Sequence, residues 1–453
     1  MPLTSDDREF RKKIYRELTD KPLKPGDPRY QPIYGHPGCE DPIQLLQDSI
    51  DFADCESLNL FSGFRGSGKT TELFRLQDRL EKAGYVVLYA DAIDYISPTA
   101  PIQISDLLII LAGAFSDALQ EMKIDLTHET YWTRFWNYLT KTEVMAKELN
   151  LKTEVGMDPV KAGAELKLEF KTTPSFREKL SKALGDRIGD LRREVESFFE
   201  DGFKDIRKKR GDAAKVVFLF DSLEQIRGSL SNEQEVTRSV ELLFSNYLPL
   251  LNIPYLHMVY TVPPWLKFVL PGVNMVVLPC LRMWDRNAGR AKCEPGVKAA
   301  EALVEKRFSH QGLERFFGPE PLKRADRLIS MCGGHYRDLL LLLRETVLRA
   351  DSLPVSEEAI NAAIIRVRSN YLPISLEDAQ WLAQIERERA TPLKSTAQAE
   401  INRLTKFLDT HIVLYLRNGE EWYDVHPLVR DEVCRIAASA PVTPPPPTVT
   451  TTP

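Results

Sequence analysis

The stretch that decides the fold runs from Ser57 to Gly84 and reads SLNLFSGFRGSGKTTELFRLQDRLEKAG. Its first seven residues form a short apolar run typical of a strand, and residues 72–84 have the apolar spacing of a helix. The segment GFRGSGKT (63–70) between them fits the pattern G-x-x-x-x-G-K-[ST]. In such a loop, successive backbone N–H groups surround a phosphate chain, and the following helix directs its positive end at the same anion. We therefore predict a phosphate-binding loop; a glycine turn that binds no nucleotide is the alternative.

The loop supplies most of the predicted nucleotide-binding residues. We expect Lys69 to reach the β- and γ-phosphates and the Thr70 hydroxyl to ligate Mg²⁺. The whole predicted set in this stretch is Gly63, Phe64, Arg65, Gly66, Ser67, Gly68, Lys69, Thr70 and Thr71.

A second acidic element is expected to complete the metal site. The apolar run KVVFLFD (215–221) ends in Asp221, which is our predicted metal carboxylate, although an aspartate at this position could instead cap a helix. Three residues later, Glu224 is predicted to position or deprotonate the attacking water. A solvated glutamate at the start of a helix is the alternative.

Working outward from the loop, the chain alternates strands and helices. YVVLYADA (85–92) follows the helix and completes a βαβ unit, which implies a parallel sheet with a right-handed crossover. The pattern resumes with the 215–221 strand, a helix near 233–247, and strands at 255–262 and 274–280. Helices continue to about residue 370. In the last part, 375–438, helices precede the hairpin HIVLYLRNGEEWYDVH, whose Asn418-Gly419 marks a tight turn and suits a winged helix.

Residues 121–212 interrupt the αβ pattern. WTRFWNYL (132–139) spaces its aromatic residues as a helix would. ELNLKTEV (148–155) and AELKLEFK (164–171) alternate apolar and polar residues, which predicts a two-stranded hairpin. A charged helix is expected at about 175–210.

Composition excludes several classes of protein. The chain has 453 residues, a net charge of −5 and 43% hydrophobic residues, so it is neither fibrous nor wholly disordered, and bulk charge does not hold it to nucleic acid. There is no apolar region of a secretory signal at the start, and the most apolar run, LLIILAGAF (107–115), is too short to span a bilayer. We expect a soluble, cytoplasmic protein with no membrane contact, whose six scattered cysteines are reduced: Cys39, Cys55, Cys280, Cys293, Cys332 and Cys434.

Two segments together resemble a known superfamily. LFSGFRGSGKTTEL (60–73) and FLFDSLEQ (218–225) are similar to the AAA+ and STAND branches of the P-loop ATPases. AAA+ enzymes usually place Glu directly after the metal Asp, whereas STAND proteins place a small residue there and an acidic residue three positions after the Asp. Asp221-Ser222-Leu223-Glu224 matches the STAND pattern.

The resemblance implies three further nucleotide contacts. Thr261 ends the strand HMVYT, where these families carry a polar sensor of the γ-phosphate, and Pro263 stands where STAND members often have Arg. CGGHYRDL (332–339) is similar to the G-G-x-P-L segment of STAND helical domains, and its Arg337 falls where AAA+ replication initiators carry a sensor-2 arginine. An exposed arginine at the start of a helix is the alternative.

The third implied contact is His426 in VHPLVRD (425–431), which is similar to the Met-His-Asp segment of STAND winged helices. In that family the histidine touches ADP and locks the resting state. Here Pro427 replaces the acidic neighbour, and a histidine packed under the wing is the alternative. For an arginine finger from a neighbouring subunit, the candidates are Arg282, Arg286 and Arg290.

These features predict an α/β P-loop NTPase fold, a parallel sheet with helices on both faces, followed by a helical lid and a winged-helix domain. The expected cofactors are ATP and Mg²⁺, and the expected activity is ATP hydrolysis. A STAND-like switch is implied, closed with ADP and self-associating with ATP, which acts with a protein partner or effector in trans. The alternatives are a DNA-binding ATPase resembling AAA+ replication initiators, and a nucleotide-binding scaffold with little turnover. DNA is not favoured by charge, because the hairpin carries Arg417, Glu420, Glu421 and Asp424.

The predicted domain boundaries follow from these patterns. They are 1–35 for an N-terminal helix and connector, 36–120 and 213–285 for the two parts of the ATPase core, 121–212 for an inserted helix/hairpin module, 286–372 for the lid, 373–438 for the winged helix and 439–453 for a disordered Pro/Thr-rich tail.

Overall fold

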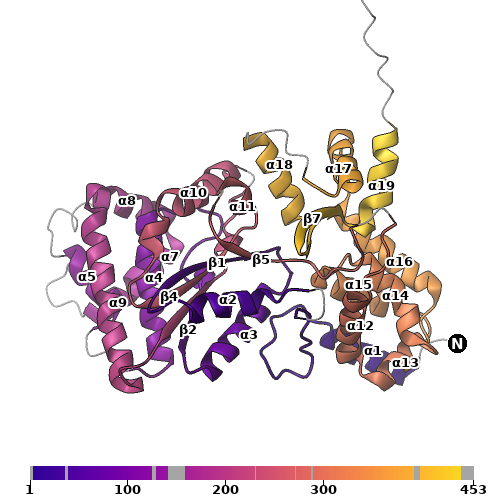
Figure 1. Cartoon of the computed structure of the whole chain (residues 1–453), viewed down its shortest axis with the longest axis horizontal. Coiled ribbons are helices and arrows are strands. Elements are labelled where there is room, and N and C mark those ends of the chain that lie inside the picture. Colours follow the sequence, from indigo (N-terminus) through magenta and orange to yellow (C-terminus); the bar gives the residue numbers. More distant parts are fainter. Residues whose placement is uncertain are drawn as a thin grey trace, which may run out of the picture. The chain divides into compact units, whose positions relative to one another are not determined.

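The computed structural model describes residues 4–35, 39–124, 129–140, 159–229, 231–270, 272–286, 289–391 and 398–439. The chain forms two compact units (Figure 1). The first, here called the sheet unit, comprises Pro22–Pro25 and Asp41–Leu278. The second, here called the helical unit, comprises Met1–Lys21, Gly26–Glu40 and Pro279–Pro453. The predicted 439–453 tail lies outside the described residues, apart from Ser439.

The sheet unit is built on five parallel strands in the order β2-β3-β4-β1-β5. The strands are β1 (Ser57–Gly63), β2 (Val86–Asp91), β3 (Val216–Asp221), β4 (Leu256–Val262) and β5 (Met275–Leu278). Each lies within a predicted strand, so the parallel α/β fold is confirmed. β4 pairs with both β1 and β3, so the end of β4 lies between the ends of those two strands.

Both faces of the sheet are covered, as predicted. Successive side chains of a strand point to opposite faces. Phe218 and Phe220 of β3 belong to one large core with the helices α4 (Ile104–Glu121) and α10 (Glu233–Asn246). Val217 and Leu219 are buried on the opposite face, on the side where α2 (Pro42–Asp51) and α3 (Lys69–Lys82) lie (Figure 1).

Helix α4 explains the apolar run at 107–115. It contacts β2 on one side and the helices of the 121–212 segment on the other, so it is buried almost all round. A helix enclosed in this way is hydrophobic on every face without spanning a membrane. Among the residues that the model describes, no helix is long and apolar enough to cross a bilayer.

The predicted hairpin in the 121–212 segment is wrong at its second strand. Residues 164–171 belong to the helix α7 (Pro159–Thr172), and 148–155 lie outside the described residues. Ala162, Leu166 and Phe170 are buried at a spacing of four, whereas Leu168 is 62% exposed. The apolar residues of AELKLEFK thus satisfy both a period of two and a helical face, and packing against α5 (Tyr131–Thr140) selects the helix.

The expected charged helix at 175–210 is two helices, α8 (Pro174–Leu184) and α9 (Ile188–Arg210). Gly185 separates them with a φ of +36°. These helices and α5 share the core of α4, so the described part of the 121–212 segment is an integral part of the sheet unit. The short helix α11 (Leu266–Val269) completes this unit.

The helical unit begins with α1 (Ser5–Glu17), which contacts α12 (Glu294–Phe308) and α15 (Tyr336–Arg349). The other helices before residue 370 are α13 (His310–Phe317), α14 (Pro321–Met331) and α16 (Glu357–Arg368). The C-terminal part has α17 (Leu376–Glu388), α18 (Gln398–Asp409), the antiparallel hairpin of β6 (Val413–Asn418) and β7 (Glu420–Val425), and α19 (Pro427–Ala438). Gly419 forms the turn with a φ of +87°, at the predicted position.

Candidate nucleotide-binding site

The candidate site lies at the carboxyl ends of β1, β3 and β4. Parallel strands bring their carboxyl ends to one edge of a sheet, where loops and helix N-termini can bind ligands. The 63–70 loop leaves β1 and leads into α3, Asp221 ends β3, and Thr261 stands one residue before the end of β4.

The loop adopts a conformation that depends on its glycines. Gly66 and Gly68 have φ angles of +82° and +92°, which side chains other than glycine rarely adopt. A Cβ on Gly63 would lie 2.9 Å from the Cβ of Leu278 and 3.2 Å from Cγ of Lys69. Ser67 closes the turn, since both its hydroxyl and its N–H donate to the carbonyl of Phe64. Helix α3 begins at Lys69, so its free N–H groups lie next to the loop.

Lys69 is the central cation of the site and is 6% exposed. Its Nζ donates to the carbonyls of Gly63 at 2.9 Å and Phe64 at 3.0 Å. It also lies 3.1 Å from Oε1 of Glu224. The 63–70 loop and the turn that carries Glu224 are therefore joined through the ammonium group of Lys69.

Asp221 is fully buried and accepts three hydrogen bonds. The Thr70 hydroxyl donates to Oδ2 at 2.8 Å, the Tyr89 hydroxyl donates to Oδ2 at 3.0 Å, and the N–H of Ser222 donates to Oδ1 at 2.8 Å. Burial, and then the nearby charge of Glu224, raises the pKa of Asp221 to about 6. A buried carboxylate whose pKa is raised in this way is favourably placed beside a bound cation.

Glu224 lies on a short turn directly after β3. Ser222 has a φ of +72°, so a small residue suits this left-handed position and turns the chain back toward the loop. The Thr261 hydroxyl donates to Oε2 of Glu224 at 2.9 Å, and Lys69 approaches the other oxygen. The structure thus brings together Lys69, Thr70, Asp221, Glu224 and Thr261, all of which were predicted from sequence to act at the site.

The residues present fit Mg²⁺ and a nucleotide phosphate chain. Thr70 and Asp221 offer two adjacent oxygens of the kind that Mg²⁺ prefers. Lys69 and the N-terminus of α3 offer positive charge to an anion. Nucleotide and metal would therefore bind next to each other at this edge of the sheet.

Three other residues of the predicted loop set have different surroundings. Phe64 is buried, whereas the side chain of Arg65 is exposed. The Thr71 hydroxyl accepts a hydrogen bond from the N–H of Leu23 at 3.1 Å, so it ties α3 to the 22–25 connector.

Sequence reasoning missed Tyr89 and Asp91 on β2. Tyr89 bonds Asp221, and Asp91 is the register partner of Asp221, with a pKa raised chiefly by burial. The sequence does contain a signal for them, because both are polar residues in the carboxyl half of the apolar run YVVLYADA. Their use at the site depends on the pairing of β2 with β3, which the sequence does not reveal.

The other predicted contacts belong to the helical unit. Arg337, at the start of α15, pairs with Asp20 at 3.3 Å. His426 is fully buried, and its ring stacks on Tyr371 with centroids 5.3 Å apart.

The three arginines proposed as fingers already have partners within the helical unit. Arg290 pairs with Glu386 at 2.8 Å and Asp424 at 3.0 Å, and Arg286 pairs with Glu420 at 3.2 Å. Arg282 donates to Sγ of Cys293.

The sheet order, the 63–70 loop and the buried acidic residue at the end of β3 decide the fold class. The sheet unit has the fold of a P-loop NTPase. Comparisons with known proteins add solved structures but no family: a scan against protein-family models gives no match, and a search of curated proteins gives none either.

Three solved structures are similar along most of the chain. The Walker-type ATPase paby2304 of Pyrococcus abyssi is 12% identical, with a TM-score of 0.40 over 92% of this chain and 99% of that chain. The ORC2 protein of Aeropyrum pernix in its ADPNP-ADP complexes is 12% identical, with a TM-score of 0.37 over 91% and 98%. The ORC1 protein of Aeropyrum pernix in complex with DNA is 13% identical, with a TM-score of 0.33 over 93% and 97%. Because these TM-scores lie below 0.5, we take the function from the chain's own side chains.

Proposed function

We propose that this protein is a Mg²⁺-dependent ATPase that transfers the γ-phosphoryl group of ATP to water. The observation that carries the proposal is the joined cluster at the edge of the sheet, in which Lys69 contacts Glu224 while Thr70 contacts Asp221. Phosphoryl transfer depends mainly on positioning and on stabilising charge, and this cluster combines a cation, two oxygens for a metal and a separate carboxylate.

Each residue has a distinct role in the proposal. Lys69 exchanges its contacts with the loop carbonyls and Glu224 for the β- and γ-phosphates. Thr70 and Asp221 hold Mg²⁺. Once released by Lys69, Glu224 orients the attacking water and accepts its proton, and Thr261 senses the γ-phosphate through its bond to Glu224.

The test is phosphate release from ATP, with and without Mg²⁺, by the full chain. Lys69→Ala is expected to lower the rate by about 10²-fold or more, because it removes the charge that faces the phosphates. Glu224→Gln is expected to keep ATP binding and lose about 10²–10⁴-fold in rate, because the amide cannot accept the proton.

Matched controls separate these effects from general damage. Lys82→Ala changes an exposed lysine at the far end of the same helix, and Glu235→Gln makes the same chemical change on an exposed position of α10. Both should hydrolyse ATP at the wild-type rate. Equal rates for Glu224→Gln and wild type would refute the role of Glu224, and tight binding with no turnover in wild type would favour the scaffold alternative.

At a finer level, we propose that the ATPase works as a STAND-like switch, with ADP in the resting state and self-association in the ATP state. In this proposal Arg337 and His426 read the nucleotide, and a protein partner or effector acts in trans. The support is the Asp221-Ser222-Leu223-Glu224 turn, whose left-handed Ser222 places Glu224 against Lys69.

The helices and the hairpin of the C-terminal part, α17 to α19, support the alternative of a DNA-binding ATPase that resembles replication initiators. The charge of these elements argues against DNA binding. On α18, Arg403 and Lys406 already pair with the acidic residues Glu377 and Asp378 of α17. The hairpin tip adds Glu420 and Glu421. DNA binding by this surface should therefore be weak, and its salt dependence should be shallow because the paired cations neutralise few phosphates. Fluorescence anisotropy with a labelled duplex at two salt concentrations would measure both.

A further inference from the structure

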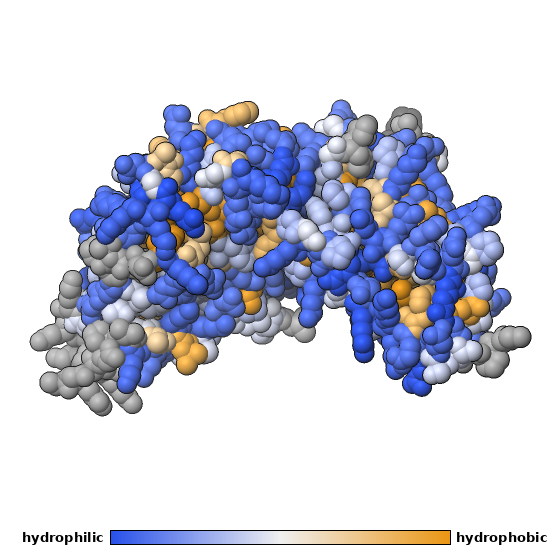
Figure 2. All heavy atoms as spheres, turned by 90° about the horizontal axis from the view of Figure 1, so that it is seen from below, coloured by the Kyte–Doolittle hydropathy of each residue, from blue (hydrophilic) through white to orange (hydrophobic). Residues whose placement is uncertain are grey.

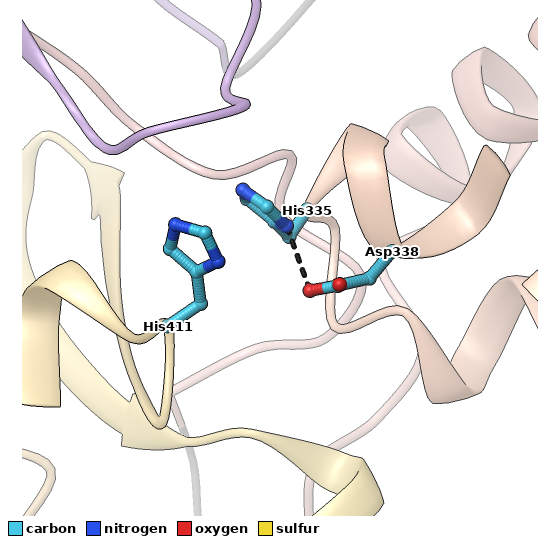
Figure 3. Close-up of side chains that lie close together, drawn as sticks. All are labelled: His335, Asp338 and His411. Atoms are coloured by element: carbon cyan, nitrogen blue, oxygen red, sulfur yellow. Dashed lines mark hydrogen bonds and ion pairs between the residues drawn. The ribbon is translucent and has the colours of Figure 1, made fainter. Parts of the chain in front are cut away.

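A second group of side chains with ligand chemistry lies in the helical unit, remote in sequence from the phosphate loop. His335, Asp338 and His411 are turned toward one another (Figure 3) and are here called the histidine cluster. His335 and Asp338 come from the start of α15, and His411 comes from the segment between α18 and β6. One ligand atom from each residue lies within 4.8 Å of the other two.

The cluster is closed to solvent. His335 is 1% exposed, Asp338 3% and His411 9%. Nδ1 of His335 lies 2.7 Å from Oδ2 of Asp338, and the two imidazole rings have centroids 3.9 Å apart. Buried polar groups normally have partners, so three of them gathered at one point call for an explanation.

One nitrogen of His411 is left without a hydrogen bond in the described part of the chain. Its Nε2 is buried and has no hydrogen-bond partner among the described residues. Burial, and then the neighbouring His335, holds the pKa of His411 well below its usual value. A neutral imidazole is the form that binds metals.

Asp338 is firmly oriented by two histidines. Burial alone would raise the pKa of Asp338. The pKa nevertheless lies well below its usual value, because His335 and His426 face the carboxylate. Nε2 of His426 lies 3.2 Å from Oδ2, while its Nδ1 accepts from the N–H of Leu428. His426 therefore lies against the carboxylate from outside the cluster and helps to fix its position.

The backbone around the cluster is fixed by close contacts. A Cβ on Gly334 would lie 1.8 Å from the carbonyl oxygen of Leu281, and one on Gly333 would lie 2.6 Å from Cδ1 of Leu414. His411 itself has a φ of +59°. These constraints hold the start of α15 against the chain segments that carry the facing side chains.

We propose that His335, Asp338 and His411 bind one transition-metal dication of the zinc class. Two imidazoles with one carboxylate form a ligand set that suits Zn²⁺, Co²⁺ or Ni²⁺, whereas Mg²⁺ prefers oxygen ligands alone. Zinc–nitrogen bonds of about 2.0–2.1 Å place tetrahedral ligands about 3.4 Å apart, so the widest pair would close by roughly 1.4 Å. The proton between His335 and Asp338 leaves to solvent on coordination, and a water completes the tetrahedron.

A metal at this point would join parts of the helical unit that are far apart in sequence. It would connect the first turn of α15 to the chain entering the β6–β7 hairpin. The role is structural: the ion stabilises the position of the hairpin relative to α15, and it takes no part in the chemistry of ATP.

The experiment uses the full chain without a polyhistidine tag, stripped with a chelator, incubated with ZnCl₂ and freed of excess metal by gel filtration. Metal analysis should find about one zinc per chain. His411→Asn should retain about none, because asparagine tolerates the left-handed backbone but lacks the imidazole. The matched control is His310→Asn, which removes an exposed histidine of the same unit and should retain zinc like wild type.

Further measurements keep the proposal falsifiable if His411→Asn does not fold. Asp338→Asn preserves the shape of the side chain and should also lose the zinc. Wild type loaded with Co²⁺ should show the intense visible bands of a tetrahedral site, and added Zn²⁺ should remove them. Wild-type protein that holds no zinc, or His411→Asn that holds as much as wild type, overturns the proposal. Because Lys69→Ala should bind zinc normally, failure here leaves the ATPase proposal untouched.

Discussion

Asp221 combines complete burial with a role that requires charge. Its pKa of about 6 comes mainly from burial and then from Glu224. Below pH 6 the carboxyl group holds a proton and loses its value as a metal ligand, whereas above pH 6 it is ionised. At pH 5 about nine tenths of the free protein is protonated, so the affinity for Mg²⁺ should fall about tenfold relative to pH 7.5.

The measurement for this pH dependence is the free Mg²⁺ concentration at half-maximal ATPase rate. The concentration of nucleotide is kept saturating at each pH, and the affinity of Mg²⁺ for ATP alone is measured at both pH values, so that protonation of ATP itself can be corrected for. A half-saturating Mg²⁺ concentration that is the same at pH 5 and pH 7.5 would show that Asp221 is not the metal carboxylate.

Gly334 is required for a steric reason that can be separated from its backbone angle. Gly334 and Gly419 have similar φ angles, +82° and +87°, but only Gly334 meets a backbone atom where a Cβ would stand, the oxygen of Leu281 at 1.8 Å. Gly419→Ala should cost about 1 kcal/mol, from the left-handed angle alone. Gly334→Ala should cost more than about 3 kcal/mol, because the chain at residue 281 must move as well.

Hydrogen exchange of peptides from the helical unit, followed in increasing urea, measures both costs without assuming that the whole chain unfolds in one step. Similar costs for the two alanine variants would contradict the close approach of Gly334 to Leu281.

At the scale of elements, the five strands of the sheet were predicted well because their short apolar runs fit a strand and no other element. β3 is buried on both faces of a parallel sheet and appears as a continuous apolar run that ends at aspartate. β1 is shorter in apolar residues, but it ends at the glycine that opens the phosphate loop. The segment at 164–171 was ambiguous, since its apolar residues fit both a strand and a helix. The order in which the strands pair could not be predicted from the sequence either, and the role of Tyr89 was missed for that reason.

The helix at α7 predicts different effects for two neighbouring leucines. Leu166 is 2% exposed and Leu168 is 62% exposed, whereas in a hairpin both would point to the same face. Leu166→Ala should therefore cost about 2–5 kcal/mol, and Leu168→Ala less than about 0.5 kcal/mol. Urea unfolding followed by hydrogen exchange in the sheet unit tests this pair, and equal costs would favour the strand.

At the scale of the whole molecule, the two units carry different parts of the predicted site. Lys69, Asp221 and Glu224 lie in the sheet unit, and Arg337 and His426 lie in the helical unit. The sequence predicted Lys69 from the phosphate-loop motif, and it predicted Asp221 and Glu224 from their positions at and just after the end of the 215–221 strand. The structure joins these residues by direct contacts. For Arg337 and His426 the sequence offered only similarity, and their partners within the helical unit, Asp20 and Asp338, could not be foreseen.

The hydropathy of the surface limits how copies of this protein could associate with one another. On the face shown in Figure 2, hydrophilic side chains predominate, and hydrophobic ones gather in patches separated by them. A large permanent apolar interface is not visible on that face. The switch proposal makes self-association depend on the nucleotide, and on this face it would have to use a largely polar surface.

Particle mass measured by mass photometry tests this dependence on nucleotide. Without nucleotide and with ADP, the protein should be monomeric. ATP with Mg²⁺ should produce a defined multimer, which Glu224→Gln retains longer than wild type because its ATP is not consumed. Lys69→Ala should stay monomeric throughout, while Lys82→Ala should behave as wild type. If every state remains monomeric although nucleotide is shown to bind, self-association is wrong, and the ATPase must act through DNA or as a single chain.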